Sequence, residues 1–356
     1  MRILYFLCAF ALFGNLSAQT PLMKPAISPD GNSIAFSYQG DIWVSAVSGQ
    51  NTTRLSLHEA YESNPIWTAD GKFLVFSSNR FGNNDLYKIS VNGGIPKRLT
   101  YHSASDTPYS VTPDGDILFI TSRNYRQVER ESEIYILENS KATERRFMDA
   151  LGFDPVLSPD GKKVAFTRGT CRIAREAYNG PANREVWIYD IESDAYTNIS
   201  QHDTNDFNPQ WINNDEVVFI SGRSGKYNLH QANLQGSISQ LTKRTDFGIQ
   251  HFSISAATQK IAYQTVKQSY VFNRNTNQTK PLGINIESDY RFDPVVKKTV
   301  TNRVNEYAIS PNAKLIAYSH RGEIFVTRND KEDSKSVRLT DQPSRESNPT
   351  WLNDSV

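Results

Sequence analysis

The feature that most constrains the fold of this chain is an internal repeat. A turn such as Ser-Pro-Asp-Gly, flanked by short apolar runs, recurs with its aligned turn residues at positions 30, 70, 114, 160, 214, 257, 312 and 354. Successive turns are therefore separated by 40 to 55 residues. Repeats of this length that are built from strands are typical of β-propeller blades.

Each repeat is predicted to form four strands. In the first repeat these strands are Lys24–Ser28, Ser33–Tyr38, Asp41–Val47 and Thr52–Ser56. The Pro-Asp-Gly turn joins the first two strands, because Pro presets φ and Gly accepts a positive φ. The third strand of most repeats carries an aromatic residue that we expect to pack between blades; these residues are Trp43, Tyr87, Tyr135, Trp187 and Phe325.

Six contiguous repeats predict an all-β fold, a six-bladed β-propeller followed by the start of a second propeller. We expect the six-bladed propeller over residues 19–287, a charged connector over 288–304, and a first blade with part of a second over 305–356. The first and sixth repeats each have four strands of their own, so the ring should close by side-chain packing without a shared blade. A blade is stable only against its neighbours, so we expect the C-terminal segment to be poorly ordered.

The first eighteen residues resemble a secretory signal peptide. Arg2 precedes the apolar run Ile3–Phe13, and Leu16-Ser17-Ala18 resembles a cleavage site. Another apolar stretch long enough for a membrane helix is not found, so we expect an exported, periplasmic protein without stable membrane insertion. After cleavage Cys171 is the single thiol, expected in a loop and partly exposed, without a disulfide.

Charged residues recur in the loops at one end of the blades. The chain has 39 Lys and Arg against 38 Asp and Glu, and this balance argues against nucleic acid as the main partner. Within this balance, a His is followed four residues later by an acid, and a Phe four residues later by an Arg. The histidines are His58, His102 and His202, the acids Glu62, Asp106 and Asp206, and the arginines Arg80, Arg123 and Arg223.

Two interpretations of this rim remain open. The His and acidic residues could brace each loop while the arginines pair with neighbouring acids, a role that every blade needs. Alternatively, the arginines could line a channel mouth and bind peptide carboxylates, which suit a guanidinium fork. A metal site is not expected, because the ring fixes the spacing of the histidines and ligand geometry does not.

The longest predicted loop, Arg168–Arg184, has the same ambiguity. It contains Arg172 and Arg175, which could bind substrate, or it could be a flap that packs on its blade. Sequence motifs for a nucleophile elbow, a phosphate-binding loop or a zinc protease are not found. We therefore assign no catalytic residue and expect no cofactor and no metal.

Several segments carry a family resemblance. The Ser-Pro-Asp-Gly turns and the Arg-Leu-Thr-x-His segment are similar to TolB-like propeller repeats. Three further features are more specific: Lys24–Gly31 directly after the leader, Tyr178–Trp187, and Asn305–Asn312 followed by Arg321–Phe325. Together they resemble the N-terminal region of tricorn-type proteases over essentially the whole mature chain.

That resemblance implies a six-bladed propeller, a seven-bladed propeller, a PDZ module and a serine-peptidase domain that carries the catalytic residues. The propellers of this family are conduits for peptides. The basic pair that archaeal members place between blades two and three is absent here, where the loop is Ser103–Thr107.

We therefore expect a non-catalytic segment of an exported tricorn-like serine protease that guides or gates peptide substrates. Its expected partners are peptides or unfolded polypeptide, the PDZ and peptidase domains of the parent protein, and further copies of itself. A TolB-like protein-binding propeller and the propeller of a prolyl-oligopeptidase-like enzyme are the alternatives.

Overall fold

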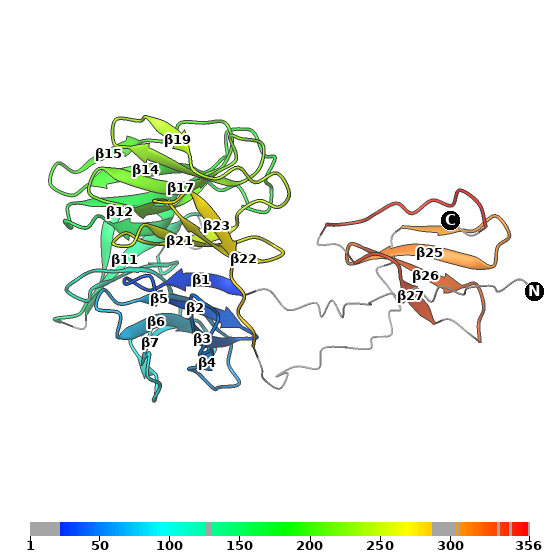
Figure 1. The fold of residues 1–356 in the computed structure, drawn as a ribbon, viewed down its shortest axis with the longest axis horizontal. Helices are drawn as coiled ribbons and strands as arrows, with labels where there is room; N and C mark the ends of the chain where they lie inside the picture. Colours follow the sequence, from blue (N-terminus) through cyan, green and yellow to red (C-terminus); the bar gives the residue numbers. More distant parts are fainter. Residues whose placement is uncertain are drawn as a thin grey trace, which may run out of the picture. The chain divides into compact units, whose positions relative to one another are not determined.

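The computed structural model describes residues 22–124, 130–141, 143–286, 304, 306–332, 335–341 and 344–354. The predicted signal peptide lies outside these residues. The chain divides into two compact units, Met1–Glu287 and Ser288–Val356. Strands are the only regular elements in the described parts, and Figure 1 labels many of them. The predicted all-β class is confirmed.

Four sheets of the first unit are four-stranded antiparallel meanders in which neighbours in space are neighbours in sequence. They consist of β1 (Met23–Ile27), β2 (Ser33–Tyr38), β3 (Asp41–Ala46) and β4 (Thr53–Arg54); β5 (Glu62–Trp67), β6 (Phe73–Ser78), β7 (Asp85–Ser90) and β8 (Lys97–Arg98); β16 (Asp206–Trp211), β17 (Glu216–Ser221), β18 (Asn228–Asn233) and β19 (Ile238–Gln240); and β20 (His251–Ser255), β21 (Lys260–Gln264), β22 (Ser269–Asn273) and β23 (Gln278–Pro281).

The two middle repeats are joined into one seven-stranded sheet. Its strands are β9 (Thr107–Val111), β10 (Ile117–Thr121), β11 (Ser132–Glu138), β12 (Thr143–Leu157), β13 (Lys163–Arg168), β14 (Glu185–Asp190) and β15 (Ala195–Asn198). The long strand β12 pairs with β11 as far as Gly152 and with β13 from Phe153 onward. It is thus the outer strand of one four-stranded repeat and the inner strand of the next. No Ser-x-His segment separates the two strands here, so the chain continues without a loop.

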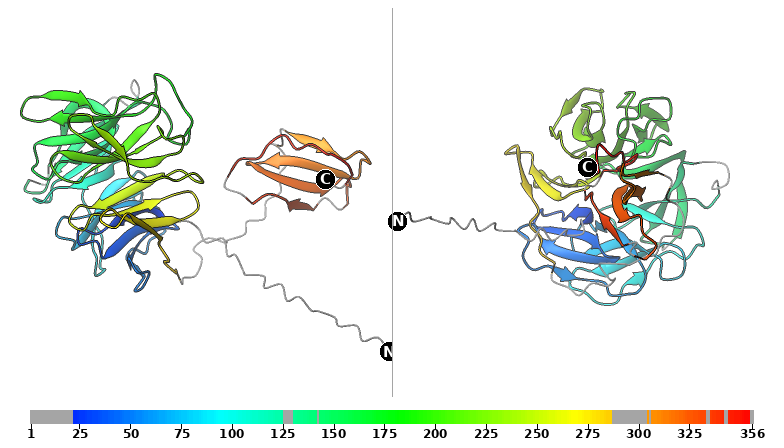
Figure 2. Two further views of the ribbon diagram at one scale, coloured as in Figure 1. Left: turned by 45° about the horizontal axis from the view of Figure 1, so that its top comes forward. Right: turned by 90° about the vertical axis from the view of Figure 1, so that its right-hand side faces the viewer.

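The repeats follow one another around a ring, from blue to yellow in Figure 2. Each junction between adjacent repeats has its own apolar core, including the junction of the last repeat with the first. At that closing junction Trp43 and Phe36 of the first repeat pack with Leu282 of the last. The Ser253 hydroxyl donates to the Pro25 carbonyl oxygen across it, at 3.0 Å. The predicted closure by packing, without a shared sheet, is confirmed.

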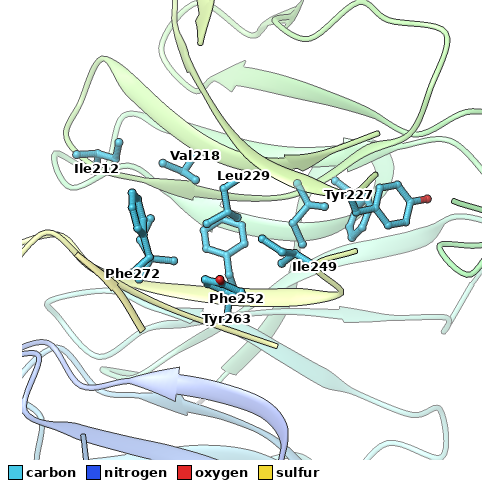
Figure 3. Packing of buried hydrophobic residues seen from close by; sticks show 11 residues of the cluster. Ile212, Val218, Tyr227, Leu229, Ile249, Phe252, Tyr263 and Phe272 are labelled. Carbon is cyan, nitrogen blue, oxygen red and sulfur yellow. The ribbon is translucent and has the colours of Figure 1, made fainter. Parts of the chain in front are cut away.

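A cross-strand aromatic pair lies at the centre of these junctions. Phe76 faces Tyr87, Phe119 faces Tyr135, and Phe36 faces Trp43, always between the second and third strands of a repeat. The predicted packing between blades is confirmed for the first unit: Tyr87, for example, lies in one cluster with Ala26 and Ala35 of the preceding repeat. Figure 3 shows such a junction, where residues of β17 and β18 face residues of β20 to β22.

The innermost strand of most repeats is interrupted by a bulge at an X-Pro dipeptide. The residue before Pro has a positive φ near 54° in four inner strands of the first unit; these residues are Lys24, Asn64, Asp154 and Asn208. The pairing register with the second strand shifts at each of these positions. A bulge turns a side chain out of the ladder and is common next to functional sites. Asn and Asp tolerate this conformation, whereas it is unusual for Lys.

The second unit contains one antiparallel sheet. Its strands are β24 (Tyr307–Ile309), β25 (Leu315–His320), β26 (Glu323–Arg328) and β27 (Ser336–Arg338). Tyr318 and Phe325 form the same cross-strand aromatic pair as in the first unit, with ring centroids 5.5 Å apart. The interpretation of this unit as part of a second propeller stays a prediction.

The aromatic pair of Phe219 and His230 predicts that the stability of the protein depends on pH. His230 takes the place of the third-strand aromatic residue and faces Phe219. Burial lowers the pKa of His230 to about 4, from a usual 6.5. The unfolded chain therefore binds a proton more readily than the folded chain between these values, and stability falls as the pH drops through 6.5. At pH 5 this histidine should cost about 2 kcal/mol of unfolding free energy relative to pH 7.5.

The variant His230→Phe restores an aromatic pair that does not titrate. We expect its loss of unfolding free energy between pH 7.5 and 5, measured by urea denaturation, to be about 2 kcal/mol smaller than that of the wild type. Equal losses in the two proteins would contradict the role assigned to His230.

Candidate functional site

The three rim arginines form ion pairs with acids of their own blades. The shortest nitrogen–oxygen distances are 2.6 Å for Arg80–Glu62, 3.0 Å for Arg123–Asp106 and 2.7 Å for Arg223–Asp206. All three acidic side chains are 0% exposed. The Arg123 guanidinium also pairs with Glu144 on β12. These contacts favour the interpretation in which the arginines neutralise buried acids.

The pKa values of two of these acids reflect both their burial and their arginine partners. Burial raises the pKa of Asp106 and of Asp206, and the adjacent Arg123 and Arg223 guanidinium groups oppose this shift. A buried carboxylate that loses its cationic partner is strongly destabilising. The guanidinium groups therefore stabilise the fold by pairing with these buried carboxylates.

The three rim histidines bind their own loops. Nδ1 of His58 accepts the Ala60 amide at 2.9 Å, and Nδ1 of His102 accepts the Ala104 amide at 2.9 Å. His202 accepts the Thr204 amide at 3.2 Å, and its Nδ1 lies 2.8 Å from the Thr204 hydroxyl. In the described parts of the chain, the acids of the pattern contact arginines rather than these histidines. Among these residues, no group of three or more His, Cys, Asp or Glu side chains is placed to hold a metal ion.

The long loop with Arg172 and Arg175 is a clamp between two repeats. Its Glu176 accepts the Tyr227 amide of the next repeat at 2.7 Å. Arg172 and Arg175 are exposed, and the Arg175 guanidinium lies over the Tyr178 ring. This arrangement favours the flap interpretation, while the substrate role of the two arginines is untested.

The expected exposure of Cys171 is wrong. Cys171 is 4% exposed, although it lies within the loop Arg168–Arg184. The Asn205 side-chain amide lies 3.6 Å from its sulfur and donates to the Tyr227 hydroxyl at 3.0 Å. The thiol is therefore part of the packing between two repeats.

A second candidate site lies inside the ring. A cavity of about 360 Å³ is lined by residues from all six inner strands, β1, β5, β9, β12, β16 and β20, and is therefore the central channel. Its lining runs from the X-Pro bulges to the turns that contain Pro29, Ala69 and Ala257. Apolar side chains such as Ile66, Val111 and Ile254 cover most of its wall.

Polar side chains gather at the bulged end of this channel. We call this group the collar; it consists of Lys24, Asn64, Tyr109, Asp154, Asn208 and His251. All except Tyr109 occupy equivalent positions in their repeats, and Tyr109 follows the equivalent Pro108. All except Asp154 line the cavity. The collar was not predicted from the sequence, although an X-Pro dipeptide that recurs at one position of the repeat could have indicated it.

The acidic residue of the collar, Asp154, forms hydrogen bonds with three neighbouring residues. Oδ2 of Asp154 accepts the Thr167 hydroxyl at 2.9 Å and the Asn208 amide at 3.1 Å, and the Tyr109 hydroxyl also bonds to Asp154. Burial and the Asp154 charge raise the pKa of Tyr109 well above its usual value, so Tyr109 is neutral. Asp154 thus links adjacent repeats.

Burial lowers the pKa values of the two basic collar residues, Lys24 and His251. Burial lowers the pKa of Lys24, while Asp154 raises it and Arg184 lowers it further. Burial and the nearby Lys24 lower the pKa of His251 well below its usual value, so this imidazole is neutral at pH 7. The collar therefore combines one cation, one anion and four neutral side chains that can form hydrogen bonds.

Comparison with known proteins places the chain among propeller proteins. The profile of the tricorn protease N-terminal beta propeller domain matches residues 19–278. Tricorn protease homolog 1 of Streptomyces coelicolor is 26% identical over 220 residues, which are 59% of this chain and 20% of the relative. An uncharacterized peptidase of Bacillus subtilis is 25% identical over 203 residues, 43% of this chain and 30% of the relative. The chain thus spans less than a third of either relative.

Solved structures agree on the fold. The crystal structure of the tricorn protease matches with a TM-score of 0.67 at 19% identity, covering 92% of this chain and 32% of that chain. The propeller domain of the trilobed protease from Pyrococcus furiosus, described as having an open velcro topology, matches with a TM-score of 0.50 at 16% identity, covering 76% and 85%. Among the described residues, no helix has the length and apolar character needed to cross a bilayer.

The rim contacts predict a loss of stability when an arginine is removed. Arg80→Ala leaves Glu62 buried without its cation, and we expect about 3 kcal/mol less unfolding free energy. The double variant Arg80→Met with Glu62→Met should recover most of that loss, because no charge stays buried. Arg172→Ala, at an exposed arginine, is the control and should change stability by less than about 0.5 kcal/mol. Urea denaturation measures all three. An Arg80→Ala protein as stable as the wild type would refute this role.

Proposed function

Because the chain belongs to the family of tricorn protease N-terminal β-propeller domains, we propose that it is a non-catalytic propeller segment that receives peptides in its central channel. The observation that carries the proposal is the channel itself, with a volume of about 360 Å³ and a wall built from every repeat. The rim arginines were the other candidates for binding peptides, and their guanidinium groups are held by buried acids. In the parent protease, peptide cleavage would be the task of domains other than this propeller.

The lining of the channel supports a peptide ligand. Binding sites for small ligands are concave and mostly apolar, with a few polar groups that fix orientation. The channel has this composition, with apolar walls and the polar collar at one end. An extended peptide presents alternating side chains and unpaired backbone groups, which suit both surfaces. Guidance of peptides toward or away from a peptidase site would follow from such binding.

The second unit is proposed to begin a second propeller. Two hydrogen bonds place its terminal segment against the sheet: Trp351 Nε1 donates to the Ala308 carbonyl oxygen, and the Asn348 amide donates to Glu306 Oε2, both at 2.9 Å. In the first unit, Trp211 Nε1 donates to Val156, and the Asn208 amide to Asp154. These matching bonds support the proposal that the terminal segment begins the inner strand of a following blade.

Export to the periplasm is proposed from the sequence alone, since residues 1–18 have the pattern of a signal peptide. Association with PDZ and peptidase domains and with further copies of the chain is proposed from the family. Cleavage of the leader between Ala18 and Gln19 in the secreted protein, read by mass spectrometry, would support the first of these proposals.

The channel proposal is tested by obstruction. Ala257→Trp places an indole at the channel lining, and Ala195→Trp places one on the outer strand β15 as a control. We expect binding of fluorescein-labelled unstructured peptides, measured by anisotropy, to weaken at least tenfold in the first variant and to stay unchanged in the second. The peptides should stay intact throughout. Equal binding by both variants would refute a channel site, and cleavage sensitive to a serine-directed inhibitor would refute the non-catalytic role.

The domain proposal is tested by limited proteolysis. We expect the first cleavage within residues 288–304, and a resistant fragment that ends near Ile286, because the sheet of the second unit leaves Tyr307 and Leu339 more than half exposed. Intact mass spectrometry of the fragments gives the boundary. A resistant fragment that includes β24 to β27 would contradict it.

A further inference from the structure

Lys24 differs from the two acids that occupy its position in other repeats. The equivalent residues Asp154 and Glu306 accept the backbone amide of an Asn in the following inner strand, from Asn208 and Asn348 respectively. A lysine ammonium is a donor only and cannot accept an amide hydrogen. At the junction of the first two repeats, this position therefore holds a side chain that cannot form the junction bond.

The backbone at Lys24 is also unfavourable for lysine. Its φ is 55°, in the left-handed region where the other X-Pro bulges carry Asn or Asp. A residue other than Gly, Asn or Asp held there costs of order 1 kcal/mol. Such outliers persist where the surrounding structure holds them and cluster at ligand sites. An asparagine at this position would fit the backbone better and would bury no charge.

Among the described residues, the Lys24 ammonium group has no protein partner. The Lys24 backbone amide donates to Gln264 Oε1 at 2.9 Å, but among the residues that the structure describes the ammonium makes no hydrogen bond or ion pair. Asp154 is occupied by Thr167, Asn208 and Tyr109. Lys24 lines the cavity and Asp154 does not. The channel thus presents an unpaired cation at its bulged end.

The charges around Lys24 favour an anion. The titratable groups that act on it are Asp154 and Arg184, and its own charge acts on His251. The Arg184 guanidinium is held over the Phe153 ring and donates to the Cys171 carbonyl oxygen at 2.9 Å. With His251 and Tyr109 neutral, Lys24 and Arg184 exceed Asp154 by one positive charge. A carboxylate would match this excess, and the Asn64 amide group and the His251 ring line the same cavity.

We propose that the Lys24 ammonium is an anchor for a carboxylate inside the channel, with Asn64 and His251 as neighbouring polar contacts. The carboxylate would belong to a peptide, either its C-terminus or an Asp or Glu side chain. The identification of the ligand as a peptide rests on the proposed channel function. The carboxylate site itself can be tested without peptides.

The first experiment measures peptide selectivity. Labelled peptides of one sequence carry a free or an amidated C-terminus, and an internal Glu or Gln. We expect the wild type to bind at least one carboxylate form about tenfold or more tightly than its neutral counterpart. Lys24→Asn should bind the charged and neutral forms equally, yet unfold at the same or a higher temperature, because Asn suits the bulge. Lys280→Met, at an exposed lysine on β23, should keep the wild-type preference.

A preference that survives in Lys24→Asn would overturn the proposal, as would equal binding of all peptides by the wild type. The pair of free-acid and amidated peptides, compared with the Glu and Gln pair, distinguishes a C-terminal carboxylate from a side-chain one. Should Lys24→Asn fail to fold, Lys24→Gln provides the test: it removes the charge at a similar length and should bind the charged and neutral forms equally, so a preference retained in it would overturn the proposal.

A second experiment does not depend on peptide binding. Lysines are dimethylated with ¹³C-formaldehyde, and the Lys24 methyl signal is assigned from its absence in Lys24→Asn. Its pKa is followed by NMR in sodium acetate and in sodium chloride of equal ionic strength. We expect acetate to raise that pKa and leave the Lys280 signal unchanged. An identical Lys24 titration in both salts would overturn the carboxylate site, whereas a shift without any peptide binding would refute only the channel function.

Discussion

The structure depends on the packing of one sheet face against the next. A four-stranded meander of this size has two apolar faces and is not stable by itself. In the first unit each face is covered by an adjacent repeat, and the pair of aromatic residues on the second and third strands fills the space between them. The closing junction is built in the same way as the others. Closure therefore needs no exchanged strand, and the ring is held by six similar apolar junctions within the described residues.

This packing forces all inner strands to face a common axis. The junctions bring inner-strand residues of every repeat of the first unit to one channel, so a single feature of the repeat becomes a ring of features. The X-Pro bulge is such a feature, and it produces the collar. Where the bulged residue is acidic it bonds to the next repeat, as Asp154 does. Where it is Lys24, the same geometry directs a cation toward the channel.

The charged rim has a different structural role. In three repeats an acidic residue is buried at or just before the start of an inner strand; these residues are Glu62, Asp106 and Asp206. A guanidinium from the next loop neutralises each acid and stacks near an aromatic ring, as Arg80 does over Tyr87. Repetition in several blades is what a structural role predicts. The collar differs from blade to blade, which is what a binding role allows.

The sequence by itself determined the blade pattern, because that pattern is local. Turn chemistry at Pro-Asp-Gly, the alternation of apolar residues, and the aromatic residue of the third strand act within a single repeat. The sequence also indicated the two alternatives for the rim, since the His, acid and Arg spacing is visible there. The choice between the alternatives needed the distance from Arg80 to Glu62, which depends on how the loop folds over the strand.

Only the tertiary structure decided what lies in the channel. Lys24, Asp154 and His251 are far apart in the chain and become neighbours because the ring closes. The buried position of Cys171 likewise depends on a contact with Asn205 of the next repeat. Local propensity could not reveal these features, since each depends on residues of other repeats. The physical reason is that a repeat fixes its own strands, whereas its neighbours fix where its side chains meet.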